Sequence, residues 1–198
     1  MQAELRGRAH KYGKNVDTDV IIRIERLTQL PREALGPYAF EAWRGSAFIL
    51  DQPRFRDARI LIAGPNFGCG SSREGAVWAL HALGLRVVIA PSFGDIFFSN
   101  CFQNGMLPVV LPEEVVRDLA EQCADGTPIT VDLRSCLVLA SDGTRHAFQI
   151  DPLRREMLLE GVDELGLTLR RTGEIHAWQR DDAARRARAT PRREGRLS

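Results

Sequence analysis

Residues 59–74 read RILIAGPNFGCGSSRE, and this stretch decides the fold that the sequence predicts. Residues 59–64 are a short apolar run that ends in glycine, which is typical of a buried strand. Residues 71–83 then place apolar side chains on one face of a 3.6-residue repeat, and Gly84 fits the C-terminal cap of such a helix. The stretch therefore predicts a strand, a glycine-rich loop and a helix.

The alternation of strand and helix continues on the C-terminal side of this stretch. Apolar runs at residues 86–90 and 107–111 predict two further strands. Pro112 and the two glutamates after it predict another helix, since proline suits the first helical position and acidic side chains suit the N-terminal end of the helix dipole. The order strand, helix, strand, helix, strand over residues 59–125 indicates an α/β fold with parallel strands.

The C-terminal third combines a hairpin, a helix and a tail. Residues 129–133 and 137–140 predict a β-hairpin, and residues 151–161 have the acidic cap, early proline and terminal glycine of a helix. We expect one domain over residues 1–178. The arginine-rich residues 179–198 are expected to be a fraying helix followed by a disordered tail.

The composition limits the kinds of partner. The chain has 198 residues, of which 44% are hydrophobic, enough for the core of one domain. Its 27 Lys and Arg against 26 Asp and Glu leave no global field that would attract nucleic acid or an anionic membrane. The charged N-terminal stretch lacks the apolar core of a signal peptide, and no run is long enough to span a membrane. We expect a cytoplasmic protein without a membrane or nucleic-acid partner.

The cysteines do not follow a metal-binding pattern. Cys69, Cys101, Cys123 and Cys136 are widely separated, with no C-x-x-C pair and no histidine at zinc spacing. Iron–sulfur clusters generally need closely grouped thiolates. We therefore expect reduced thiols, and neither a metal nor a cofactor held by this chain.

The glycine-rich loop has the chemistry of an anion site. Gly68 and Gly70 permit backbone conformations that other residues avoid, and the start of the following helix offers unpaired N–H groups at the positive end of its dipole. Ser71 and Ser72 add hydroxyls, and Arg73 adds a planar guanidinium suited to a carboxylate or phosphate. Nucleotide-binding loops do not fit, because the third glycine of G-x-G-x-x-G and the Walker lysine are missing.

Structural explanations compete for several of these polar residues. Ser71-x-x-Glu74 also matches a capping box, in which the serine and the glutamate bind the first free backbone amides of a helix. Asp17 and Asp19 precede an apolar run, where Asx-turn chemistry explains them without a substrate. Helix capping likewise explains two side chains before the aromatic-rich segment, Ser92 and Asp95.

Residues 66–74, NFGCGSSRE, closely resemble the active-site loop of the swivelling domain of the aconitase superfamily. Four further blocks match the same superfamily in order: residues 15–22 (NVDTDVII), 89–97 (IAPSFGDIF), 100–108 (NCFQNGMLP) and 163–169 (DELGLTL). The last two blocks resemble the small subunits of bacterial isopropylmalate isomerases in particular. The resemblance extends from about residue 5 to 178.

The resemblance implies a fold and an activity. The fold is a swivelling β/β/α domain of the aconitase C-terminal type, which closes over a [4Fe–4S] cluster held by a separate large subunit in a heterodimer or heterotetramer. The activity is that of a hydro-lyase, active only with the large subunit. It isomerises 2-isopropylmalate to 3-isopropylmalate by dehydration and rehydration in leucine biosynthesis.

The resemblance also assigns roles to residues. Ser71 matches the catalytic base that takes a proton from carbon, and Ser72 and Arg73 match residues that hold a substrate carboxylate. Residues 23–29 match the loop that helps to choose between an isopropyl group and a carboxylate on the far side of the substrate. The candidate substrate contacts in this loop are Arg26, Leu27 and Thr28.

Three positions depart from the family pattern. Gly75 stands where the family usually has histidine, Arg23 where it has proline, and Gly94 where it has alanine. Charges at Arg23, Glu25 and Arg26 make the selecting loop more polar than an isopropyl pocket suggests. A solvated loop with outward-facing charges also explains them and is the preferred explanation.

Two alternatives therefore stay open from the sequence. One is a related hydro-lyase acting on another diacid of the homoaconitate, citraconate or dimethylmaleate type. The other is a non-catalytic scaffold or RNA-binding domain with the arginine-rich tail as its contact surface. The apolar group formed by residues 96–98 and Phe102 fits either a core or a subunit contact.

Overall fold

The structure is a computed structural model, which describes residues 4–7, 11–45, 48–55, 57–70, 73–162, 166 and 172–189. The chain divides into two compact units, residues 1–161 and residues 162–198. The first unit contains both sheets and the glycine-rich loop.

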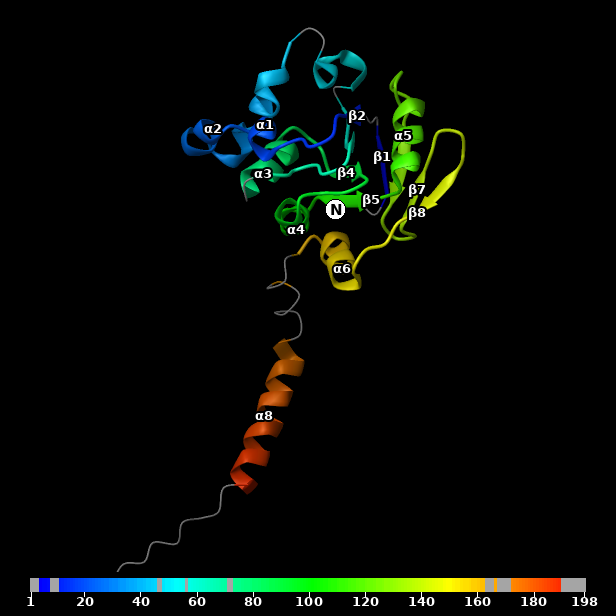
Figure 1. Ribbon diagram of the computed structural model, residues 1–198. Coiled ribbons are helices and arrows are strands. Elements are labelled where there is room, and N and C mark those ends of the chain that lie inside the picture. Colours follow the sequence, from blue (N-terminus) through cyan, green and yellow to red (C-terminus); the bar gives the residue numbers. More distant parts are fainter. Residues whose placement is uncertain are drawn as a thin grey trace, which may run out of the picture. The chain divides into compact units, whose positions relative to one another are not determined.

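A parallel sheet lies at the centre of the first unit (Figure 1). Its strands lie side by side in sequence order: β2 (Lys11–Tyr12), β3 (Ile60–Ala63), β4 (Val87–Ala90) and β5 (Leu107–Val110). All four residues of β3 and of β4 are buried, which explains their continuous apolar sequences. The three strands predicted over residues 59–111 and their parallel pairing are confirmed.

Helices connect these strands as the alternation of elements predicts. They are α3 (Glu74–Ala82) between β3 and β4, α4 (Asp95–Gln103) between β4 and β5, and α5 (Glu113–Gln122) after β5. Pro112 is the residue before α5 and not its first helical residue, because its ψ of 145° is extended. The predicted position of this proline is thus wrong by one residue.

An antiparallel sheet forms a second layer. Its strand order is β1 (Glu4–Gly7), β6 (Ile129–Asp132), β7 (Leu137–Leu139) and β8 (Arg145–Ala147). Pairing of β6 with β7 confirms the predicted hairpin. Helix α6 (Pro152–Glu160) follows, with the Asp151 side chain accepting from the Arg154 N–H at 3.0 Å and Gly161 at a φ of 66°. Both ends of this helix are as predicted.

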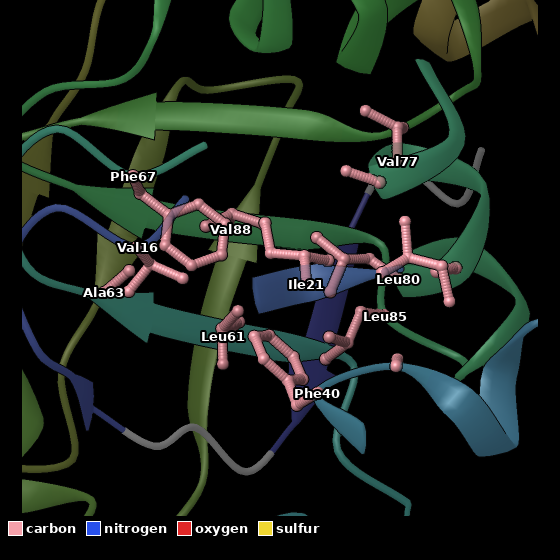
Figure 2. Packing of buried hydrophobic residues seen from close by; sticks show 14 of the residues in the cluster. Val16, Ile21, Phe40, Leu61, Ala63, Phe67, Val77, Leu80, Leu85 and Val88 are labelled. Carbon is pink, nitrogen blue, oxygen red and sulfur yellow. The ribbon is translucent and has the colours of Figure 1, made fainter. Parts of the chain in front are cut away.

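The two faces of the parallel sheet belong to two cores, because side chains alternate along each strand. Leu61 and Val88 point into a core shared with α1 (Thr18–Ile21) and α3, where they meet Ile21 and Leu80 (Figure 2). The opposite face, which includes Ile62, packs with α5 and the antiparallel sheet. This arrangement of sheet, sheet and helices is the β/β/α layering that the resemblance implies.

Short helices fill the connection between β2 and β3. They are α1, α2 (Ile24–Gln29), η1 (Arg32–Ala34), η2 (Gly36–Tyr38), η3 (Glu41–Trp43), η4 (Ile49–Asp51) and η5 (Pro53–Phe55). Phe40, immediately before η3, is fully buried in the core shared with α1 and α3, called the first core below, and is labelled in Figure 2. This connection brings α1 and α2 to the side of the sheet on which α3 lies.

The apolar group of α4, residues 96–98 and Phe102, is mainly core. Phe97 and Phe102 are buried, one in each core, and Phe98 is half-buried. Ile96 alone of this group is exposed, at 50%.

The second unit contains α8 (Thr172–Ala189), which continues through residue 178. The division at residue 178 stays a prediction, and the matching block at residues 163–169 lies outside the described residues except for Gly166. Among the residues that the structure describes, no helix is long and apolar enough to cross a membrane.

Candidate active site

The glycine-rich loop runs from the end of β3 to the start of α3. Ser71 and Ser72, the predicted base and one predicted carboxylate ligand, lie outside the described residues. Their neighbours Gly70 and Arg73 are described, so the structure defines how the loop is held on both sides of the serines.

Glycine is required at two positions of this loop. Gly68 and Gly70 have φ values of 73° and 88°, in the left-handed region. A Cβ atom on Gly68 would overlap the ring of Phe97, with Cδ1 at 2.6 Å, and one on Gly70 would lie 2.6 Å from the carboxyl carbon of Asp17. The loop therefore needs glycine both for its backbone conformation and for close packing.

The segment that contains the D-T-D sequence lies along the loop. The Asn15 N–H donates to the Pro65 carbonyl at 2.9 Å. The Gly68 N–H donates to the Val16 carbonyl at 2.8 Å, and the Thr18 N–H donates to the Cys69 carbonyl at 2.9 Å. These bonds fasten the loop to the start of α1 as a short parallel pairing.

The two aspartates of the D-T-D sequence have different partners. The Asp17 side chain caps α1 by accepting from the Asp19 N–H at 2.7 Å, as expected for a structural role. The Asp19 carboxylate forms an ion pair with the Arg73 guanidinium. This pair was missed from the sequence, because 54 residues separate its members and only the fold brings them together.

Helix α3 begins later than a capping box requires. Its first residue is Glu74, and Arg73 precedes it without a side-chain cap. The Glu74 carboxylate accepts from the Asn104 side-chain amide at 2.8 Å, and the oxygen of that amide accepts from the Trp78 indole at 3.0 Å. The capping-box interpretation is therefore wrong, since Glu74 ties the start of α3 to the end of α4.

Ser92 also has a role other than the predicted cap. Its hydroxyl accepts from the Asn66 N–H at 2.9 Å, and its carbonyl accepts from the Phe67 N–H at 3.1 Å. Helix α4 is preceded by Gly94, and Asp95 is already its first residue. Ser92 thus holds the glycine-rich loop, and the prediction that it and Asp95 cap α4 is wrong.

Helix α2 carries the three candidate substrate contacts in different surroundings. Arg26 forms an ion pair with Glu41, through Nε at 3.0 Å and Nη2 at 2.5 Å, and its guanidinium lies 4.3 Å from the centre of the Tyr38 ring. The hydrogen bond from Arg26 lowers the pKa of Glu41 below its usual value. The Thr28 hydroxyl donates to the Glu25 carbonyl at 2.9 Å and is exposed. The charge of Arg26 is therefore balanced by a neighbouring carboxylate.

The third candidate, Leu27, packs against α3. A Cβ atom on Gly75 would lie 2.5 Å from each terminal methyl carbon of Leu27. Gly94 similarly permits close packing, because its Cβ would lie 2.5 Å from the Gly68 carbonyl oxygen. At two of the three departures from the family pattern, Gly75 and Gly94, a neighbouring residue thus lies too close to the glycine backbone to leave room for a side chain. The third, Arg23, is exposed, as the solvated-loop explanation predicts.

The described residues do not fit an iron–sulfur cluster. In the ranges that the structure describes, no three His, Cys, Asp or Glu side chains are grouped as metal ligands. Cys101 and Cys123 are buried, and burial raises the pKa of Cys123 to about 11. A thiolate, the form that binds iron, is disfavoured there.

This fold and this loop define a class of protein. The model of the aconitase C-terminal domain family matches residues 8–114, more than half of the chain. The chain belongs to this family.

Within that class the chain is similar to several 3-isopropylmalate dehydratase small subunits. The relative from Cereibacter sphaeroides strain ATCC 17029 is 48% identical over 181 residues, covering 87% of this chain and 90% of the relative. The relative from Paracoccus denitrificans is 47% identical over 174 residues, covering 83% and 87%. The crystal structure of 3-isopropylmalate dehydratase from Methanocaldococcus jannaschii superposes with a TM-score of 0.70 at 29% identity, covering 88% of this chain and 99% of that chain.

These similarities confirm the predicted fold class and the predicted class of enzyme, an aconitase-family hydro-lyase small subunit that works with a large subunit.

Proposed function

We propose that this chain is the small subunit of a 3-isopropylmalate dehydratase and that its glycine-rich loop binds and deprotonates the substrate. The observation that carries the proposal is the fastening of the loop on both sides of Ser71. The D-T-D segment and Ser92 hold residues 66–70, and Asn104 holds the start of α3. A catalytic group acts efficiently only when its position is fixed before the reaction.

Arg73 is proposed to hold a substrate carboxylate together with Ser72. Its guanidinium has five N–H donors in a plane, which match the two oxygens of a carboxylate. Arg73 lies immediately before the nine-residue helix α3, whose unpaired N–H groups add positive potential. Both features favour a dianionic substrate at this loop.

Ser71 is proposed to take the proton from the substrate carbon. A serine hydroxyl is a weak base unless its alkoxide is stabilised. The N-terminus of α3 and the cation of Arg73, both within three residues of Ser71 in the sequence, would supply this stabilisation. In the assembled enzyme, an iron–sulfur cluster supplies the Lewis acid that activates the hydroxyl leaving group. We propose that the large subunit holds this cluster, because the described residues of this chain contain no group of cysteines that could bind it.

The surroundings of α2 favour an isopropyl group over a second carboxylate at the selecting position. Leu27 offers an apolar surface next to α3, and the positive charge of Arg26 is already paired with Glu41. A substrate of the homoaconitate type would need a cation with a free pair of N–H donors there, whereas Glu41 already occupies both Nε and Nη2 of Arg26. We therefore prefer 2-isopropylmalate, and with it leucine biosynthesis, to the other diacids.

Assembly as a heterodimer or heterotetramer and a cytoplasmic location stay predictions. The scaffold or RNA-binding alternative rests only on the arginine-rich residues 179–198. Helix α8 also carries Glu174, Asp181 and Asp182, which oppose binding to a polyanion.

The proposed function is tested by anaerobic turnover. The chain is purified with its cluster-loaded large subunit and supplied separately with 2-isopropylmalate, a homoisocitrate-type diacid and a methyl-substituted diacid. Turnover of 2-isopropylmalate with the highest kcat/KM is expected. Turnover of another diacid alone would contradict the assignment of substrate, and turnover of none would favour a non-catalytic domain.

Gly75→Ala is expected to lower kcat/KM for 2-isopropylmalate by roughly tenfold, because the new methyl group displaces Leu27 from its place against α3. The thermal midpoint of unfolding is not expected to fall in proportion, since alanine favours helix by about 1 kcal/mol over glycine. Initial rates across substrate concentrations and a thermal unfolding curve measure the two effects.

Gly173→Ala is the matched control for this substitution. It makes the same change within a helix, α8, where the described part of the chain places no atom within 4 Å of the added Cβ apart from its chain neighbours and the backbone of its own helix. Unchanged kcat/KM in Gly75→Ala would show that the position of Leu27 does not affect substrate choice.

A further inference from the structure

The structure gives Asp19 a partner that the D-T-D sequence does not suggest. Asp17 binds backbone, whereas Asp19 binds the guanidinium of Arg73. We infer that Asp19 is a positioning residue for Arg73, holding the guanidinium where it receives a substrate carboxylate. This inference rests on the proposed function, in which Arg73 binds that carboxylate.

Asp19 is itself held in place. Its backbone N–H donates to Asp17 Oδ1 at 2.7 Å, and the backbone N–H of its neighbour Thr18 donates to the Cys69 carbonyl at 2.9 Å. Thr18 and Ile21, on the same short helix, are buried at 1% and 0% exposure. The carboxylate of Asp19 therefore extends from a fixed point beside the loop.

Arg73 needs such a fixed partner more than most residues do. An arginine side chain loses up to about 2 kcal/mol of conformational freedom when it is ordered. Its side chain here is 25% exposed, and Asp19 is its only ion-pair or hydrogen-bond partner among the described residues. Asp19 orders the guanidinium before the substrate arrives, which reduces the cost of ordering it on binding.

The pair leaves room for a substrate carboxylate. The contact with Asp19 is made through Nη1 of Arg73, and a guanidinium has further N–H groups on Nη2 and Nε. The Asp19 carboxylate and a substrate carboxylate can thus bind different sides of one guanidinium. Asp19 is a permanent neighbour of the bound substrate and not a competitor that must leave.

The sign of the change in KM separates positioning from simple electrostatics. Removing a negative charge near the site should lower KM for a dianion if only the charge matters. Loss of positioning should raise KM, because Arg73 must then be ordered by the substrate. The two effects oppose each other, so a rise identifies positioning.

The test uses the full chain assembled with its cluster-loaded large subunit and 2-isopropylmalate as substrate. Asp19→Ala is expected to raise KM by about fivefold to tenfold and to change kcat by less than about twofold, because a charge-assisted hydrogen bond to Arg73 is lost. Asp19→Asn keeps an oxygen acceptor and should show a smaller rise. Asp95→Asn is the matched control, since Asp95 is also exposed in the first turn of a helix but its side chain has no hydrogen-bond or ion-pair partner among the described residues.

A second variant separates this inference from the proposed function. Arg73→Ala should raise KM strongly, and Asp19→Ala should have no further effect on KM in the Arg73→Ala background. An unchanged KM in Arg73→Ala overturns the proposed role of Arg73. An effect of Arg73→Ala on KM together with an unchanged or lowered KM in Asp19→Ala overturns the positioning role alone. A fall in kcat with unchanged KM also overturns it, because it indicates a general disturbance of the loop.

Discussion

Ser71→Ala is expected to lower kcat for the dehydration of 2-isopropylmalate by about 10³-fold, within the range that general acid–base groups contribute. The methyl group cannot accept the proton from the substrate carbon. Binding is expected to persist, because Arg73 and the start of α3 are unchanged. Anaerobic turnover measures the first effect, and isothermal titration of the assembled enzyme with 2-isopropylmalate measures the second.

Ser141→Ala serves as the control for Ser71→Ala. Ser141 is an exposed residue after β7, where its hydroxyl donates to the Gln122 side chain at 2.8 Å, and it belongs to the antiparallel part of the fold. Its replacement should leave kcat unchanged. Retained turnover in Ser71→Ala would exclude this serine as the base, and loss of binding together with turnover would instead assign it to the carboxylate site.

Gly68→Ala is expected to lower the free energy of unfolding by about 2–5 kcal/mol. A left-handed conformation costs a residue with a side chain about 1–2 kcal/mol, and overpacking costs about 1–3 kcal/mol more. The overpacking arises because the new Cβ would overlap the ring of Phe97, which is 2% exposed in the first core. Thermal or urea unfolding of the small subunit measures the loss.

Gly105→Ala separates the two contributions. Gly105 has a φ of 69°, similar to that of Gly68, but among the described residues no atom other than those of its chain neighbours lies within 4 Å of an added Cβ. Its replacement should cost only the conformational part, about 1–2 kcal/mol. Equal losses in the two variants would show that Phe97 moves aside freely and that the loop is not packed as tightly as the distances indicate.

The central strands and their helices could be predicted from the sequence because their signals are local. The runs around Ile60, Val87 and Leu107 are apolar over consecutive residues, and buried parallel strands require that pattern. Strand β2 was not predicted, since two residues carry no periodicity. The helix caps were predicted less well. Pro112, Ser92 and Glu74 could each fill more than one position or hydrogen-bonding role at a helix end, and contacts with neighbouring elements determined which one they have.

By itself, the sequence determined where the glycine-rich loop lies, between a strand and a helix that are both specified by local hydrophobic patterns, and the chemical roles of Ser71, Ser72 and Arg73 in that loop stay predictions. Only the tertiary structure decided which side chains meet. It places Asp19 against Arg73 and Leu27 against Gly75, contacts between residues about 50 positions apart in the chain. The physical reason is that hydrophobic periodicity specifies local elements, whereas such contacts arise only when those elements pack on a common core.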